Sequence, residues 1–202
     1  MRGKLGAAVV IILGLLSASC GASRPVKYYS LEPQLASGVP AANQYAISLV
    51  VGHISAPPLF RDDRIVYTMG PVQRGAYEYH RWAEPPTEMI SAMLVQALRS
   101  TGQYRSVERL SSSVKSDYIV KGRVFAIEES DSPSLAARFA MEIELYQPKS
   151  GTTVWTGSYT HDEAVSKKSV DAVIEAMDRN VKEGLSQLVA GVGQYFASHP
   201  PQ

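Results

Sequence analysis

The apolar positions of this chain predict a series of strands. The run 45–54 is almost continuously rich in Ile, Leu and Val, which is typical of a buried strand that ends before Pro57. From Phe139 to Tyr146 apolar residues alternate with polar or small ones, and a period of two indicates a strand with one buried face. Other apolar runs predict short strands at 64–69, 76–82 and 103–110, a longer strand at 117–127, and a last strand at 153–161.

Two other segments repeat their apolar positions every three or four residues, which predicts helices. The first begins near Pro85 and Pro86, because proline is tolerated in a first turn, and it ends at Gly102. The second begins near Ser169 and keeps this spacing for about six turns, although two glycines weaken its last turns.

The order of these elements predicts the fold class. One strand, a hairpin with a longish loop from Gly70 to Gly75, and a helix come first. Four strands follow, with the turn 149–151 joining the last two, and then the long helix. Consecutive strands after a single helix favour an α+β fold, with a mixed, mainly antiparallel sheet and two helices packed on one face.

The first twenty residues have the composition of an export signal. Arg2 and Lys4 precede the uncharged, mostly aliphatic stretch 6–16, which is shorter than the roughly 20 residues that span a bilayer. Small residues then lead to Cys20, the single cysteine. We therefore predict a lipoprotein signal peptide at 1–19 and acyl chains, such as palmitate, on Cys20. Two alternatives are an ordinary secretory signal with an incidental cysteine and an N-terminal anchor.

The mature chain then divides into three parts. Residues 20–43 contain three prolines and little apolar periodicity, so they are expected to form the lipidated N-terminus and a tether. Within them the run 27–31 is aromatic enough to pack on the domain or on a partner. One domain is expected at 44–197, followed by a polar tail at 198–202. Gly21, where Asp would favour inner-membrane retention, predicts an outer-membrane location facing the periplasm.

Composition and charge narrow the function further. The chain has 20 basic and 19 acidic residues, and losing Arg2 and Lys4 with the signal changes the net charge from +1 to about −1. Neither nucleic acid nor an anionic surface is implied. The four histidines, 53, 80, 161 and 199, are scattered, and no nucleophile or phosphate-loop motif is present. We therefore expect no metal, no enzymatic activity and no cofactor beyond the covalent lipid.

One segment, 77–86, combines aromatic and charged side chains directly before the first helix. The residues expected to contact a partner are Tyr77, Tyr79, Arg81, Trp82 and Glu84. The alternative is a strand-to-helix corner, in which Trp82 fills the core and Arg81 pairs with Glu84.

The runs 54–59, 64–67 and 79–86, together with 27–31, resemble the ABC-type transport auxiliary lipoprotein family, which includes the PqiC lipoproteins. The resemblance spans about 28–196, and R-W-A-E-P-P is its most specific part. It implies a fold similar to the TolB N-terminal domain and no catalytic residues. It also implies partners, an MCE-domain substrate-binding protein and its ABC transporter, which move lipids or other hydrophobic compounds across the envelope.

Three functions follow as hypotheses. The first is a membrane-tethered docking module of such a system, which could form a homo-oligomer. The second is a periplasmic carrier that holds a lipid between sheet and helices. The third is a structural or assembly lipoprotein of the envelope, similar to Tol proteins or LptE, because fold alone does not fix function.

Overall fold

A long strand, β6 (Tyr118–Ser130), forms the centre of the fold. The computed structural model describes residues 24–32, 44–111 and 115–201. On one side β6 pairs along its whole length with β7 (Ala136–Gln147), which pairs with β8 (Thr152–Ala164). Both of these ladders are antiparallel and they are the longest in the sheet.

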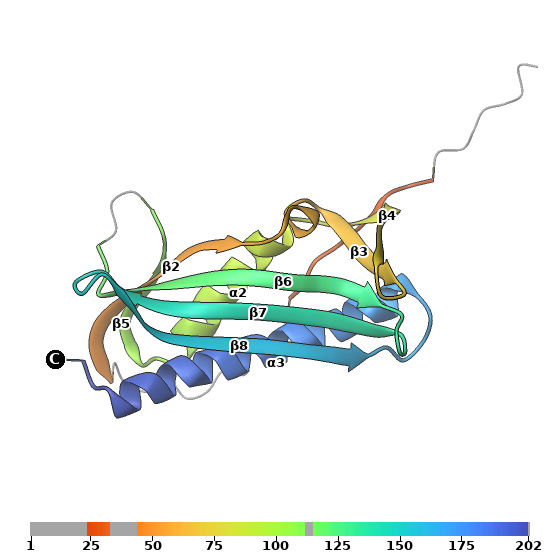
Figure 1. Ribbon diagram of the computed structural model, residues 1–202. Helices are drawn as coiled ribbons and strands as arrows, with labels where there is room; N and C mark the ends of the chain where they lie inside the picture. The colour runs from red at the N-terminus through yellow and green to blue at the C-terminus, as the bar shows by residue number, and fades with distance from the viewer. Residues whose placement is uncertain (1–23, 33–43, 112–114, 202) are drawn as a thin grey trace, which may run out of the picture.

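On its other side β6 is shared by two strands, so the sheet forks (Figure 1). The first half of β6 pairs in parallel with β2 (Tyr45–Ser55), and β5 (Tyr104–Arg109) lies outside β2. The second half pairs in parallel with β3 (Arg64–Met69). The mixed, mainly antiparallel sheet is therefore confirmed.

The branch that begins with β3 continues through two further strands. A short 3-10 helix, η2 (Pro58–Phe60), leads into β3, and β4 (Gln73–Trp82) pairs with β3 as an antiparallel hairpin. The loop of this hairpin is only three residues long, shorter than predicted, and Gly70 begins it with a φ of 66°. The outermost strand is β1 (Lys27–Tyr29), which pairs in parallel with β4.

The strand β1 was not predicted, since it lies inside the segment expected to be a tether. Three residues carry too little pattern to identify a strand from sequence. The sequence left open whether the aromatic run 27–31 packs on the domain or on a partner. In the structure β1 packs on the domain, and Leu31 beyond it is 4% exposed.

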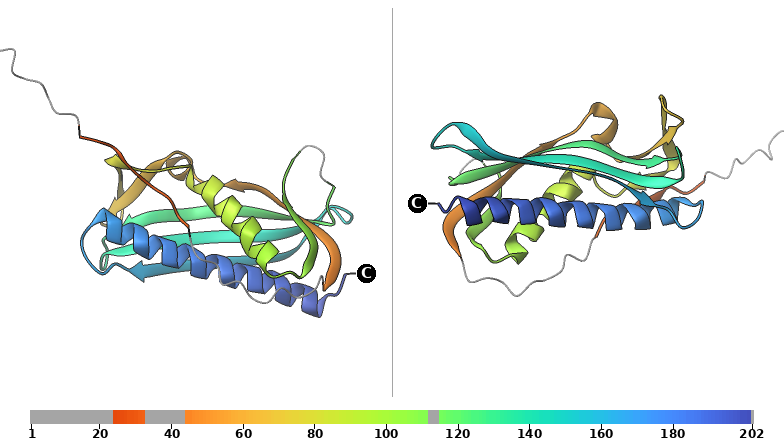
Figure 2. Two further views of the ribbon diagram at one scale, coloured as in Figure 1. Left: turned by 180° about the vertical axis from the view of Figure 1, so that it is seen from behind. Right: turned by 60° about the horizontal axis from the view of Figure 1, so that its bottom comes forward.

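Both helices lie on the same face of the sheet, as predicted (Figure 2). The shorter helix α2 (Pro86–Ser100) packs on β2 and β5, and α3 (Val170–Ser198) packs on β7 and β8. Ser169 caps α3, since its hydroxyl accepts a hydrogen bond from the Ala172 amide. Within the described ranges, no helix combines the length and the apolar composition needed to cross a membrane.

The long helix continues through Gly191 and Gly193, the two glycines that were expected to weaken it. A Cβ atom at Gly191 would lie 2.7 Å from the Trp155 ring, and one at a third glycine, Gly184, would lie 2.6 Å from the Tyr159 ring. Gly184 and Gly191 therefore let α3 approach the aromatic side chains of β8 closely. The packing gained by this approach offsets the lower helix propensity of glycine.

A buried polar side chain links α3 to the sheet. Asn180 on α3 is 1% exposed and uses all its hydrogen-bonding groups there. Its Nδ2 donates to the carbonyls of Ala137 and His161, at 2.8 and 2.9 Å, and its Oδ1 accepts from the Tyr159 hydroxyl at 2.8 Å. Asn180 therefore fixes the position of α3 over β7 and β8.

We predict that Asn180→Ala lowers the free energy of unfolding by about 3 kcal/mol, because it leaves a buried hydroxyl and two carbonyls without partners. Urea unfolding followed by circular dichroism measures this. The control is Gln187→Ala on an exposed part of the same helix, which is expected to change it by less than about 0.5 kcal/mol. Equal losses in both variants would show that Asn180 has no special role.

Candidate functional site

The structure places the five predicted contact residues of the segment 77–86 in different surroundings. Tyr77, Tyr79 and Arg81 lie on β4 and are partly exposed, and Glu84, between β4 and α2, is exposed. The Trp82 side chain is 1% exposed and belongs to the core. Its Nε1 finds no hydrogen-bond partner among the described residues. Trp82 is therefore a core residue at a strand-to-helix corner, and its ring is not offered to a partner.

Arg81 pairs with Asp63, and not with Glu84 as the corner alternative predicted. Its Nη1 lies 2.8 Å from Asp63 Oδ1. The reason is the register of the hairpin, which sets Arg81 opposite Arg64 and so beside the residue preceding it. Glu84 is left exposed at the corner.

Tyr77 belongs to a row of aromatic side chains, which we call the aromatic row. It consists of Tyr67, Tyr77, His80 and Tyr29, in this order. Successive ring centroids are 5.0, 5.6 and 5.7 Å apart, within the range of favourable aromatic contacts. The row connects three strands, β3, β4 and β1.

Carboxylates on β6 and α3 bind the hydroxyl groups of the row. The Tyr77 hydroxyl donates to Glu129 Oε2 at 2.7 Å, and burial together with this bond raises the pKa of Tyr77. The Tyr29 hydroxyl donates to Asp171 Oδ1 at 2.8 Å and lies 2.8 Å from His80 Nδ1. Because a hydroxyl carries one proton, this pattern assigns the donating N–H to His80 Nδ1. Burial and then the bond to Asp171 raise the pKa of Tyr29 to about 12.

Two further hydrogen bonds hold the N-terminal segment to the domain. The Ala83 amide donates to the Tyr29 carbonyl at 2.7 Å, which extends the pairing of β1 with β4. The Glu32 amide donates to Asp178 Oδ1 on α3 at 3.1 Å. Burial raises the pKa of Asp178, although the bond from Glu32 opposes this effect. Residues 27–32 are thus fixed to both β4 and α3.

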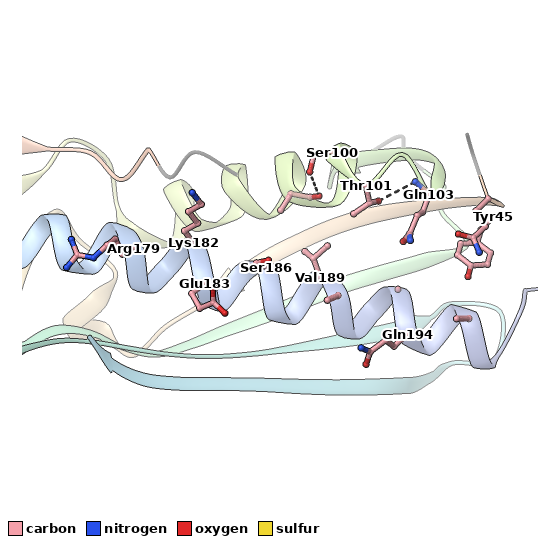
Figure 3. Close-up of a pocket in the computed structure, with 15 residues that line it drawn as sticks. Tyr45, Ser100, Thr101, Gln103, Arg179, Lys182, Glu183, Ser186, Val189 and Gln194 are labelled. Atoms are coloured by element: carbon pink, nitrogen blue, oxygen red, sulfur yellow. Dashed lines mark hydrogen bonds between the residues drawn. The ribbon is translucent and has the colours of Figure 1, made fainter. Parts of the chain in front are cut away.

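Two hollows lie near these elements. One, of about 800 Å³, opens beside the aromatic row between β3, β4 and the end of β6, and Tyr67, Tyr77, Glu129 and Lys168 are among the residues that line it. The other is a groove of about 760 Å³ between α2 and α3 (Figure 3). Small residues, Tyr45 and Val189 line this groove together with polar side chains, among them Lys182 and Glu183.

Among residues 24–32, 44–111 and 115–201, no three histidine, cysteine, aspartate or glutamate side chains are grouped so that they could hold a metal ion. His80 is engaged in the aromatic row, and His161 lies on β8 beside Glu163. Cys20 lies outside the described residues, so its lipidation stays a prediction.

Tyr67 and the two acids that bind the aromatic row, Glu129 and Asp171, were not identified from the sequence. Tyr67 and Glu129 lie side by side in the parallel register of β3 and β6, which depends on strand order. Asp171 is 142 residues from Tyr29 in the chain. The one available signal was the aromatic run 27–31, whose position among prolines suggested packing without indicating a partner.

These features define an α+β domain with two helices on one face of a mixed sheet. The family model of the ABC-type transport auxiliary lipoprotein component matches residues 29–189. The chain therefore belongs to this family, as the resemblance at the sequence level predicted.

Solved structures share the fold at low sequence identity. A crystal structure of a protein from Xanthomonas campestris has a TM-score of 0.78 and 22% identity, and the match covers 86% of this chain and 98% of that one. The crystal structure of an uncharacterised protein has a TM-score of 0.66 and 17% identity, covering 84% and 99%. Among curated proteins, no match is found for this chain.

We predict that Tyr29→Phe lowers the free energy of unfolding by about 1 kcal/mol at neutral pH, because Asp171 and His80 lose a shared partner. The pKa of Tyr29 is higher in the folded protein than the ordinary value of 10.0, so its neutral form is the one the fold favours. The difference between wild type and variant should therefore persist below pH 10 and disappear as pH rises through about 12.

Urea unfolding at a series of pH values measures this effect. The matched control is Tyr28→Phe, since the neighbouring Tyr28 side chain is 64% exposed and should change stability by less than about 0.5 kcal/mol. A pH-independent difference for Tyr29→Phe would contradict the role given to its hydroxyl.

Proposed function

We propose that this protein is a membrane-tethered docking module of an ABC transport system that moves lipids or other hydrophobic compounds across the envelope. The family match over residues 29–189 is the observation that carries this proposal. The partners are an MCE-domain substrate-binding protein and its ABC transporter. The work of the module is positioning, because tethering raises the concentration of the docking surface near the partner.

The anchor in this proposal is a lipid on Cys20, in the outer membrane and facing the periplasm. Each buried methylene group contributes about 0.8 kcal/mol, and one acyl chain alone binds only marginally. The two or three chains of a lipoprotein cysteine would therefore hold the domain at one membrane for long periods.

The proposed docking surface is the exposed corner where β4 meets α2. It consists of Tyr79, Arg81 and Glu84, which offer an aromatic ring, a positive charge and a negative charge within six residues. Tyr77 borders this surface from the aromatic row. Trp82 is left out, since its buried ring supports the corner from below. Assembly of several copies stays a prediction.

The carrier hypothesis has less support from the packing. Side chains of sheet and helices fill the space where such a lipid would lie, among them Leu94, Phe139 and Phe196, all with no exposed surface. The two hollows are open surface grooves and lie outside this core.

We predict that Cys20→Ala moves the protein from the membrane fraction to the soluble periplasm, because the acyl chains are lost. Fractionation of the envelope and mass spectrometry of the mature chain measure this, and circular dichroism should show an unchanged fold. The matched variant Gly21→Asp keeps the cysteine and is expected to shift the protein to the inner membrane. Membrane association of Cys20→Ala equal to wild type would refute the anchor.

We predict that Tyr79→Ala weakens capture of the MCE-domain protein roughly tenfold, the effect of losing about 1.4 kcal/mol at an aromatic contact. Titration of the two purified proteins measures the affinity. The control is Tyr146→Ala, a partly exposed tyrosine on β7 whose ring contacts Lys121 and which lies away from the corner. If both variants bind like wild type, the corner is not the docking surface.

A further inference from the structure

The β3–β4 hairpin carries exposed apolar side chains. Among the described residues seven large hydrophobic side chains are exposed; two of these, Met69 and Val72, lie in the hairpin, and two others, Val26 and Tyr28, lie directly before β1 and within it. Val72, in the hairpin loop, is the most exposed at 87%. The first strand and the hairpin lie at the same end of the molecule in both views (Figures 1 and 2). We call residues 69–74 the hairpin end.

The direction of β1 points the described N-terminal segment away from α2. Lys27 pairs with His80 and Tyr29 with Trp82, so β1 runs parallel to the last residues of β4. Going backwards from Lys27, the chain therefore runs away from Trp82 and α2, at the end of the molecule where the hairpin lies (Figure 1). An antiparallel β1 would have directed the anchor to the opposite end, toward α2.

The length of chain available limits how far the anchor can lie from this end. Seven residues separate Cys20 from Lys27, and fully extended they reach about 24 Å. Seven residues also separate Gln73 from His80 along β4. Without the contacts of β1, the free chain would run from Cys20 to Gln44, and its reach would be about 80 Å.

The charges at the hairpin end are compatible with a phospholipid surface. Three acids near the hairpin are engaged, since Asp131 Oδ1 accepts from the Gly70 amide at 3.0 Å, Glu128 pairs with Arg74 at 2.9 Å and Glu129 accepts from Tyr77, whereas Glu78 on β4 is exposed. Arg24 and Lys27, on the chain that leads to Cys20, are exposed cations.

We propose that the hairpin end rests on the bilayer, with Val72 and Met69 entering the interface between headgroups and acyl chains, and that β1 is the clamp that keeps it there. This inference rests on the proposed anchor at Cys20. Apolar side chains that enter the interface add to the binding supplied by the acyl chains, and they fix the orientation of the domain. The corner formed by Tyr79, Arg81 and Glu84 then lies farther from the membrane than the hairpin loop.

The test uses the full lipidated protein in vesicles of phosphatidylethanolamine and phosphatidylglycerol. Because acylation occupies the single native cysteine, the variant Val72→Cys carries one free thiol for an environment-sensitive dye. We expect blue-shifted emission and strong quenching by lipids that bear a nitroxide near the headgroup. The matched position is Leu110→Cys, also exposed at 55% but beyond β5 at the far end, where neither effect is expected.

A second comparison tests the role of β1. Adding Tyr29→Phe and Leu31→Ala to Val72→Cys weakens the contacts of β1 and keeps the anchor, so the blue shift and the quenching at position 72 should both fall. Undiminished quenching in this variant would overturn the role of β1. Circular dichroism confirms that the domain remains folded in each variant.

Three results would overturn the membrane contact. They are no quenching at position 72, equal quenching at positions 72 and 110, and a blue shift at 72 that appears only when the MCE-domain protein is added, which would make the hairpin end a protein interface. Labelling of Cys20 by the dye would show that the anchor itself is absent. That outcome refutes the proposed function first, whereas a blocked Cys20 without quenching at 72 refutes this inference alone.

Discussion

The fold depends on how the two edges of the thirteen-residue strand β6 are paired. Amides and carbonyls inside a sheet need partners, and each unpaired buried group costs about 1–3 kcal/mol. One edge is satisfied by the long antiparallel strand β7. Along the other edge β2 pairs with Tyr118 to Arg123 and β3 pairs with Glu128 and Glu129, so the sheet forks.

This fork gives the molecule two ends with different exposed surfaces. The branch of β2 and β5 is covered by α2 and carries little exposed apolar surface beyond Leu110. The branch of β3, β4 and β1 projects beyond α2 and reaches the start of α3 through the aromatic row. Because β1 belongs to this second branch, the attachment of the chain and the exposed apolar residues occur at the same end.

Much of the fold could be predicted from periodicity alone. The alternation from Phe139 to Tyr146 and the helical spacing after Ser169 identified their elements, since each pattern is long enough to be unambiguous. The short strand β1 was not predicted, because its contacts with β4 and with Asp171 stabilise it. A run of three residues carries no sequence pattern that indicates these contacts. The order of the strands was likewise inaccessible, because parallel pairing joins segments that are distant in the chain.

The candidate site was less predictable than the fold. The segment 77–86 stood out by composition, but composition does not say which side of β4 faces inward, and Trp82 faces the core. Arg81 met Asp63 because the hairpin register brings the start of β3 beside it. Tyr77 was singled out for a partner, yet its hydroxyl is bound to Glu129 of the same chain.

The attachment of β1 also has a mechanical consequence. A pulling force between the membrane and the domain would act along β1, and its three pairs with β4 would be the first contacts loaded. If these pairs broke, the seventeen residues from Lys27 to Gln44 could extend to about 58 Å before any force reached β2. The core around β6 would stay intact meanwhile, so β1 makes the junction between anchor and domain extensible under load without unfolding of the domain.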